Sequence, residues 1–338
     1  MAAVTIKDIA VQLGVSPATV SLALNGRPGV NEETRTSVLK LANQLGYVPN
    51  GTKKTFPQQE VIHFLIYRKS GRIVTNTQFF TRLIESVEKA VRLQNYGLSI
   101  KYCEGPQQLE KSVADISAAQ DLGILVLGTE MNLTDLAILE EAATPLIILD
   151  NELAASSLDM VSIHNYSGIW KAIQYLREQN LTDIGYLKSS ISITNFDMRF
   201  MFYTYILSQL GMEVQPEKVF TLAPAIDEAQ LDMQKQLASG GKIPGALLAD
   251  NDLIAIGAAR ALQNAGLNIP QDVSIIGFDN IGFAEYFQPP LCSIDVPCED
   301  LGTRAVDTLL WRIKNPQAAP QHIAVGTKLI IRDSVARI

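Results

Sequence analysis

The sequence predicts a small all-α module with a helix-turn-helix at the N-terminus, followed by a larger two-lobed α/β core built on parallel sheets. Two patterns lead to this prediction. Residues 1–48 contain apolar residues at helical spacing, separated by capping residues and a turn glycine. From residue 61 onward, apolar runs of strand length alternate with amphipathic stretches of helix length, which is typical of βαβ units.

Three short helices are expected in the N-terminal module. Thr5 is a favourable N-cap, and Asp8, three residues later, completes a capping box. Gly14 ends the first helix, because the tight turn requires a residue that tolerates positive φ. Ser16 caps a second helix that has proline at its first position, and Asn31 caps a third helix with an acidic first turn.

Three spaced residues specify how the first two helices cross. Ala10 is small enough for close approach, Gly14 makes the corner, and Val20 packs into the crossing. This arrangement defines a helix-turn-helix, whose second helix enters the DNA major groove through its N-terminal residues. A helical bundle that only packs is the alternative. The residues expected at the DNA are Ser16, Pro17, Ala18, Ser21 and Leu22.

Charge is distributed unevenly along the chain. The 338 residues include 28 Lys and Arg and 35 Asp and Glu, for a formal net charge of −7. Residues 1–57, however, hold six basic and three acidic residues, so the negative charge belongs to the remainder. A basic N-terminal module on an acidic body suits DNA binding at one end.

Several other functional classes receive little support. No apolar run is long enough to cross a bilayer, and no signal peptide is recognisable, so a cytoplasmic protein is expected. Cys103, Cys292 and Cys298 lack metal-type spacing and are expected to be reduced, and neither a metal site nor a cofactor is predicted. Phosphate loops, dinucleotide fingerprints and hydrolase motifs are absent from the sequence, which argues against an enzyme.

The core elements fall into two similar series, which predict two parallel-sheet, Rossmann-like lobes. The first series runs from Val61 to Leu149 and the second from Met160 to Gly277. The strand, long helix and two short strands after Pro290 are left over and are expected to connect the lobes. Several connections make a hinge, and a cleft at a hinge can close on a ligand. The expected strands are 61–67, 98–102, 123–127, 146–149, 160–163, 184–187, 218–221, 245–248, 273–277, 291–296, 323–325 and 328–331, and the expected helices are 80–94, 109–119, 133–142, 168–178, 198–210, 228–238, 253–265 and 299–314.

Polar residues at the carboxyl ends of the strands are candidate ligand contacts, because open parallel sheets bind ligands there. Each also has an ordinary alternative: Asp252 can cap a helix, and Phe79 or Phe80 can belong to the core. Polar groups beside aromatic faces suit a small molecule such as a sugar. The candidates are Tyr67, Arg68, Glu130, Asp150, Asn151, His164, Asn165, Asn251, Asp252, Asp279 and Asn280, together with Phe79 and Phe80.

Specific motifs occur in the N-terminal module and in the second half of the core. They are Asp8-Ile9-Ala10, Gly14-Val15-Ser16, Thr19-Val20-Ser21, Gly46-Tyr47-Val48-Pro49-Asn50, Ala249-Asp250-Asn251-Asp252, Gly277-Phe278-Asp279, Pro289-Pro290-Leu291 and Arg332-Asp333-Ser334. In these motifs the chain resembles the lactose-repressor (LacI/GalR) family of bacterial transcription regulators, and the resemblance covers essentially the whole sequence.

The resemblance implies a domain organisation. Residues 1–48 would form the DNA-binding headpiece, 49–60 a hinge, and 61–338 a core like the periplasmic sugar-binding proteins. Within the core, the N-subdomain would comprise about 61–160 plus 292–322, and the C-subdomain about 161–291 plus 323–338. A homodimer on a pseudo-palindromic operator and a small effector, a sugar or sugar derivative, are implied as partners.

The resemblance also implies roles for individual residues. Phosphate contacts fall on Thr5, Ser16, Thr19, Ser21, Asn25, Asn31, Thr34 and Asn50, and base contacts on Pro17, Ala18 and Leu22. Effector contacts fall on Asp150, Arg199, Asn251 and Asp279, with Phe79 and Phe80 as pocket walls.

Three positions depart from the family pattern. Leu22 stands where some members have arginine and offers only apolar contact, for example with a thymine methyl, so the operator is expected to differ there. Phe56 matches the leucine that wedges into the minor groove, and Pro57 after it disfavours a hinge helix. His164 stands where the family usually shows aspartate.

The sequence is therefore interpreted as a ligand-responsive, sequence-specific DNA-binding regulator, a repressor of carbohydrate-use genes. Ligand binding would shift operator affinity through its preference for one lobe arrangement. Whether the ligand releases DNA or promotes binding stays open. The alternatives are a solute-binding protein and an α/β enzyme with a fused DNA-binding module.

Overall fold

The computed structural model describes residues 5–24, 29–45, 47, 60–74, 77–153 and 156–337, with the side chains of residues 32, 43 and 44 left out. The chain divides into two units, Met1–Gln58 and Gln59–Ile338, and each is described by itself. Asn25, Asn50 and Phe56, and all but the last residue of the predicted hinge, lie outside the described residues.

The first unit contains helices α1 (Ile6–Leu13), α2 (Pro17–Leu24) and α3 (Glu32–Gln44). The predicted caps are confirmed: Asp8 accepts hydrogen bonds from the backbone and hydroxyl of Thr5, each at 2.7 Å. The backbone N–H of Thr19 donates to the Ser16 hydroxyl at 3.0 Å, and that of Thr34 donates to the Asn31 amide at 2.8 Å. The predicted turn residue, Gly14, has φ of 65°.

A small core holds these three helices together. It consists of Ile9, Ala10, Val20, Ala23, Val38 and Ala42. Ala10 and Val20 lie buried at the crossing of α1 and α2, as the spacing predicted. The Arg35 guanidinium donates to the carbonyl of Ala23 at 3.2 Å and so ties α3 to the end of α2.

The described part of the second unit contains two six-stranded sheets, ordered β11-β5-β4-β3-β1-β2 and β12-β10-β9-β8-β6-β7. Neighbouring strands are parallel except β10 and β12, which are antiparallel. The strands of the first sheet are β1 (Val61–Arg68), β2 (Gly97–Glu104), β3 (Gly123–Leu127), β4 (Leu146–Leu149), β5 (Asp159–Ile163) and β11 (His322–Val325). Those of the second are β6 (Ile184–Ser189), β7 (Val219–Leu222), β8 (Ala246–Ala249), β9 (Ser274–Asp279), β10 (Cys292–Asp295) and β12 (Lys328–Ile330).

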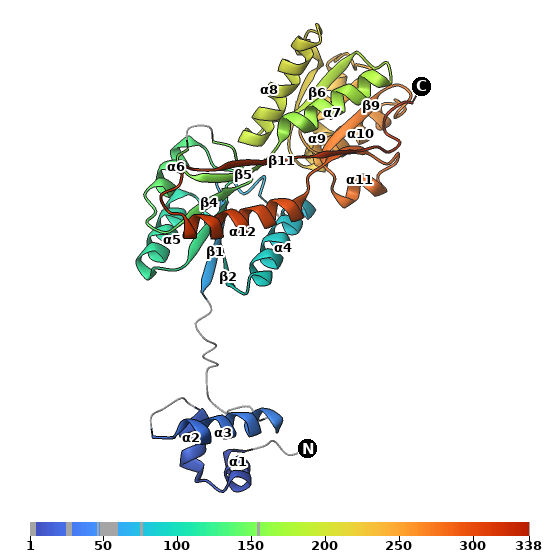
Figure 1. The fold of residues 1–338 in the computed structure, drawn as a ribbon. Helices are drawn as coiled ribbons and strands as arrows, with labels where there is room; N and C mark the ends of the chain where they lie inside the picture. Colours follow the sequence, from blue (N-terminus) through green and yellow to red (C-terminus); the bar gives the residue numbers. More distant parts are fainter. Residues whose placement is uncertain are drawn as a thin grey trace. The chain divides into compact units, whose positions relative to one another are not determined.

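Helices cover both faces of each sheet (Figure 1). On the first sheet, α4 (Gln78–Leu93) and α12 (Cys298–Lys314) pack side by side, and α5 (Pro106–Ala119) and α6 (Leu133–Glu140) supply the apolar residues of the other face. On the second sheet, α7 (Asn165–Glu178) and α8 (Thr194–Gln209) lie over one face, and α9 (Ile226–Ala238) and α10 (Asp252–Asn264) over the other. These helices leave the carboxyl ends of the parallel strands free to face the cleft between the lobes.

The predicted subdomain boundaries inside the core are wrong. Strand β5 pairs with β4 and belongs to the first sheet, whereas β10 pairs with β9 in the second. Strand β11 pairs with β5, so the two C-terminal strands lie in different sheets. The apolar pattern of a segment identifies a buried strand, but it does not show which strand pairs with it, because pairing depends on the tertiary structure. Within the described residues the chain therefore crosses between the lobes after β5, after β10 and after β11.

Some elements also begin earlier than predicted. Helix α7 begins at Asn165 and α8 at Thr194. The prediction began three or four residues later, because the first turns are largely polar and lack the apolar spacing that marks the rest of each helix. The short helices η1 (Pro216–Lys218) and α11 (Gly282–Tyr286) were not predicted. Among the described residues, no helix is long and apolar enough to cross a membrane.

Candidate DNA-binding face and ligand cavity

The first turn of α2 presents the residues predicted to contact DNA. Ser16, Pro17 and Ala18 are exposed, and Thr19, Ser21 and Leu22 are half-buried. The opposite face of the helix carries Val20 and Ala23, which are buried. One face of α2 thus packs against the core of the first unit, and the residues at its N-terminus are exposed to solvent.

Other predicted phosphate contacts lie at the N-termini of α1 and α3. Thr5 and Asn31 are exposed, and Thr34 is half-buried. The hydroxyls of Ser16 and Thr19 lie 2.9 Å apart, so one cap orients two polar groups. Helix N-termini with short polar side chains are suited to phosphate oxygens, because backbone N–H groups point outward there.

A cavity in the second unit brings together all six predicted effector residues. It encloses about 570 Å³ of space, a figure that includes its open mouth. Its walls come from both lobes. The predicted lining residues are Phe79, Phe80, Asp150, Arg199, Asn251 and Asp279, and the others include Arg72, Thr129, Ile163, Asn195, Phe196, Asp252, Leu253 and Ile281.

Arg199 of α8 is the buried cation of this cavity, with 2% of its surface exposed. Its Nε donates to Oδ1 of Asn165 at 2.9 Å, and its Nη1 donates to the backbone carbonyl of Asp250. The guanidinium stacks over the Phe278 ring at 3.6 Å and lies 3.5 Å from the Asp279 carboxylate. These contacts fix the plane of the guanidinium.

Asp150 follows β4 and has φ of 63°, a left-handed conformation that turns its carboxylate into the cavity wall. The Thr129 hydroxyl donates to one carboxylate oxygen at 2.5 Å, and the Asn195 amide donates to the other at 3.0 Å. Protein donors therefore occupy both oxygens. Burial raises the pKa of Asp150 to about 7, although Thr129 and the Arg199 charge act to lower it.

The second lobe contributes two more carboxylates. Asp252 accepts hydrogen bonds from the Ser293 hydroxyl at 2.6 Å and the Ile281 N–H at 2.8 Å, and burial raises its pKa well above the usual value. Burial also raises the pKa of Asp279, which the neighbouring Arg199 partly offsets. Asn251 caps α10 by accepting from the Ile254 N–H at 3.0 Å. The Asn251 side-chain NH₂ group can still donate to a ligand.

Apolar surfaces complete the walls. Phe79 and Phe80, at the start of α4, lie edge to face with ring centroids 5.0 Å apart. Both also belong to the hydrophobic core, so each phenylalanine is at once a core residue and part of the cavity wall. Ring faces and aliphatic side chains opposite hydrogen-bonding groups suit a ligand that has both polar edges and apolar faces.

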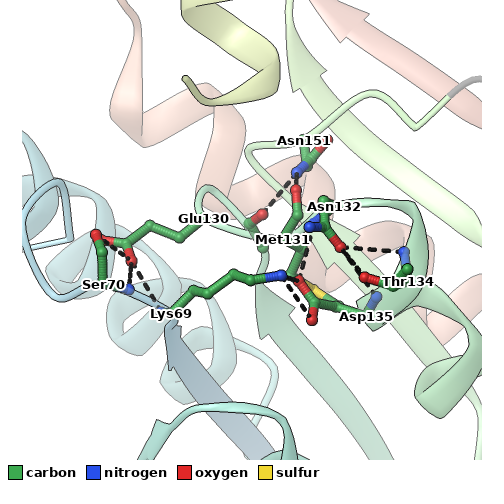
Figure 2. A network of polar contacts seen from close by, with 9 residues as sticks. Lys69, Ser70, Glu130, Met131, Asn132, Thr134, Asp135 and Asn151 are labelled. Atoms are coloured by element: carbon green, nitrogen blue, oxygen red, sulfur yellow. Dashed lines mark hydrogen bonds and ion pairs between the residues drawn. The ribbon is translucent and has the colours of Figure 1, made fainter. Parts of the chain in front are cut away.

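Glu130 and Asn151, two of the strand-end candidates, have structural roles (Figure 2). The Glu130 carboxylate accepts five backbone N–H groups at 2.6–3.1 Å, from Lys69, Ser70, Gly71, Ile73 and Val74. Burial raises the pKa of Glu130, but these donors together hold it below the usual value. The Asn151 amide donates to the carbonyls of Gly128 and Met131. Glu130 thus fixes the loop that carries Arg72 to the cavity.

Sequence reasoning missed Arg72, Thr129, Asn195 and Phe196 as lining residues. One signal for Asn195 was available: it stands four residues before Arg199, which places both on one face of a helix. No comparable pattern marked Arg72 or Thr129, because both lie in irregular segments.

Comparison with known proteins gives two family matches. Residues 5–50 match the family described as bacterial regulatory proteins, lacI family, and residues 173–335 match a periplasmic binding protein-like domain. The HTH-type transcriptional repressor CytR of Escherichia coli (strain K12) is 30% identical over 343 residues, which cover 99% of this chain and 96% of CytR. The chain belongs to the LacI family.

Other LacI-family proteins are similar over the full length. The probable HTH-type transcriptional repressor ExuR of Bacillus subtilis (strain 168) is 29% identical over 336 residues, 99% of each chain. A lac repressor dimer bound to operator and an anti-inducer shares the fold with a TM-score of 0.79 at 22% identity, covering 99% of this chain and 100% of that one. The regulator CelR in complex with cellobiose gives 0.73 at 24% identity, covering 98% and 99%.

Membership of the LacI family assigns the two parts of this chain. The helix-turn-helix of the first unit is that of a DNA-binding transcriptional regulator, and the two-lobed unit is of the periplasmic-binding-protein type. Its full-length relatives are transcriptional repressors. All three cysteines lie in the described part of the chain, where they are buried and form no disulfide.

Proposed function

We propose that this regulator represses transcription by binding a pseudo-palindromic operator as a homodimer, and that a small molecule in the cavity between its lobes controls the binding. Two headpieces fit two half-sites only when the core dimer holds them at the correct separation. A ligand that favours one lobe arrangement therefore changes operator affinity by its difference in affinity for the two arrangements.

The observation that carries the proposal is the make-up of the cavity. Arg199, Asn251 and Asp279 come from the second lobe, and Phe79, Phe80 and Asp150 from the first. A molecule that contacts both sets binds best when the lobes are close together. The three connections between the lobes can act as the hinge for this motion, within the part of the chain that is described.

The proposed effector is a sugar or a sugar derivative. Hydroxyl groups match the Asp279 carboxylate, the Asn251 amide and the donors of Arg199, and the apolar face of a pyranose matches the phenylalanine rings. The structure of CelR with cellobiose supports this choice, and the match to a periplasmic binding protein-like domain is consistent with it. Regulation of carbohydrate use follows from such an effector.

We propose that the protein acts by binding and not by catalysis. Its named relatives are repressors, which favours a regulator over an enzyme with a fused DNA-binding module. The match over residues 5–50 favours it over a solute-binding protein of a transporter. Operators lie on chromosomal DNA, so the cytoplasm is the proposed site of action.

Two measurements on the full-length protein test this function. Selection from random duplexes is expected to yield a two-fold symmetric site. A thermal-shift screen of monosaccharides, disaccharides, sugar phosphates and nucleosides is then expected to find a ligand that also changes operator affinity in fluorescence anisotropy. A protein that selects no site, or a bound ligand that leaves operator affinity unchanged, would overturn the proposal.

A further inference from the structure

Four buried polar side chains form one hydrogen-bonded chain at the wall of the cavity. Arg199 Nε donates to Oδ1 of Asn165 at 2.9 Å, and Asn165 Nδ2 donates to Oδ1 of Asn195 at 2.8 Å. Asn195 Nδ2 then donates to Asp150, at 3.0 Å to its carboxylate and 3.1 Å to its backbone carbonyl. All four residues are at most 3% exposed. Breaking any one of these hydrogen bonds would leave a buried polar group without a partner, which is unfavourable.

The two ends of the chain fix its direction. A guanidinium can only donate and the Asp150 backbone carbonyl can only accept, so both amides between them must point the same way. Asn195 presents its oxygen to Asn165 and its NH₂ group to Asp150. An aspartate at this position would place two carboxylates face to face, and an alanine would break the chain in the middle.

This chain crosses the cleft. Asp150 follows β4 in the first lobe, whereas Asn195 and Arg199 lie on α8 in the second. Asn165 is the first residue of α7, where the polypeptide has just left β5 and the first sheet. The link from Asn195 to Asp150 is therefore a direct bond between the lobes beside the hinge. Opening the cleft must stretch or break it.

Other bonds across the cleft are closer to solvent. Arg72 pairs with Glu228 of α9 at 2.8 Å, but both side chains are more than half exposed. Arg82 donates to the Asn280 carbonyl at 3.4 Å. Water and salt weaken such exposed pairs, whereas the Asn195 link is shielded from both.

We infer that Asn195 is a positioning residue that couples occupancy of the cavity to closure of the lobes. It acts through Asp150 and, by way of Asn165, through Arg199, so a ligand that pulls on either proposed contact also moves the bond between the lobes. The inference rests on the proposed function, because it assumes that the cavity holds the effector. If so, replacing Asn195 should shift the equilibrium between the open and closed lobe arrangements even when no ligand is bound.

The test measures the distance between the lobes in the full-length, ligand-free protein. Spin labels are attached through Lys111→Cys on α5 and Asn264→Cys on α10, both exposed positions, while the buried native cysteines stay unlabelled. Double electron–electron resonance is recorded for the parent protein, Asn195→Ala, Asn195→Ser and Asn195→Asp. The matched control is Asn132→Asp, because Asn132 caps α6 within one lobe and is exposed.

Labelled protein is diluted with unlabelled protein so that pairs within one protomer are measured, and the parent is expected to give one narrow distance distribution. Asn195→Ala and Asn195→Ser are expected to give a longer or broader distribution. Asn195→Asp is expected to open at pH 8 and to close again at pH 5, when a proton shared between the new carboxyl and Asp150 restores the bond. The charged groups that line the cavity with this position are Arg72, Asp150, Arg199, Asp252 and Asp279. A merely structural role would not produce this pH-dependent reversal.

Parent-like distances in all three folded Asn195 variants at pH 8 would overturn the inference, and so would an equal change in the Asn132→Asp control. Circular dichroism establishes which variants are folded, and the serine variant keeps the test valid if the others are not. A second arm measures affinity for the selected operator, where Asn195→Asp is expected to differ from the parent roughly fivefold or more. If the parent binds no duplex, the proposed function fails, while the lobe distances still decide the inference.

Discussion

At the scale of single residues, the carboxylates of the cavity differ in how much hydrogen-bonding capacity they keep for a ligand. Asp150 and Asp252 each have both oxygens filled by protein donors. Asp279 lies 3.5 Å from Arg199, longer than a good charge-assisted hydrogen bond, so it retains acceptor capacity. A ligand hydroxyl that reaches both Asp279 and Arg199 would find an acceptor and a donor side by side.

Asp279→Ala is therefore expected to abolish ligand binding while sparing operator binding, because Asp279 belongs to the cavity and not to the headpiece. Titration calorimetry with the sugar found by screening measures the first effect, and fluorescence anisotropy the second. Asp333→Ala, which removes an exposed carboxylate elsewhere, is the control. A normal binding isotherm for Asp279→Ala would exclude its role in the cavity.

Asp150 gives a prediction about pH and stability. Its pKa is raised by burial from 3.8 to about 7, so between these two pH values the folded state holds a proton that the unfolded state has lost. The stabilisation is complete at acidic pH and is lost as pH rises through the folded pKa. Asp150→Asn should therefore reduce the loss of unfolding free energy between pH 5 and pH 8 by on the order of 2 kcal/mol, measured by urea denaturation. An identical pH profile for parent and variant would contradict this.

At the scale of elements, α2 combines a buried back with an open front, and Leu22 lies half-buried at the edge between them. Leu22→Arg is expected to change the preferred base at one symmetric operator position, because arginine can read guanine whereas leucine offers only apolar contact. Binding-site selection measures the change. Leu39→Arg on the exposed face of α3 is the matched control and should keep the parent's base preferences. Unchanged base preferences for Leu22→Arg would remove the proposed base contact.

Helices α4 and α12 make a close crossing that depends on glycine. A Cβ added at Gly302 would lie 2.8 Å from the backbone carbonyl carbon of Ser86 and 2.8 Å from the nitrogen of Val87. Gly302→Ala is therefore expected to push the helices apart and to lower the unfolding free energy by about 1–3 kcal/mol in urea denaturation. Thr303→Ala, at the exposed neighbouring position, should change it little. Parent-like stability for Gly302→Ala would show that the crossing can relax.

Most elements could be predicted from the sequence because each carries its own periodic apolar pattern. The starts of α7 and α8 could not, since Asn165 and Asn195 are polar residues that the cavity buries. The spacing of apolar residues predicts which side chains are buried in a hydrophobic core, but it does not predict polar side chains that are buried by hydrogen bonding at the cavity wall. The six effector candidates were predicted from strand ends and family motifs, whereas Arg72 depends on a loop that Glu130 holds from another strand end.

At the scale of the whole molecule, the proposed mechanism requires two headpieces to act together. Each first unit has a small core of its own and few groups for base readout, so one headpiece alone should bind DNA weakly. A dimer presents the second headpiece at a high effective concentration once the first is bound. Operator affinity then depends on the spacing set by the core, and this is where lobe closure can act.

The full-length protein is accordingly expected to sediment as a dimer and to bind a duplex with both half-sites about a hundredfold or more tightly than a duplex with one half-site scrambled. Inserting half a helical turn, about five base pairs, between the half-sites should remove this advantage, because the second headpiece would face the wrong side of the DNA. Fluorescence anisotropy at one fixed salt concentration measures both ratios, since phosphate contacts make affinity salt-dependent. A monomer in sedimentation, or equal affinity for the three duplexes, would contradict control through headpiece spacing, and ligand binding in the cavity would then need another route to the DNA.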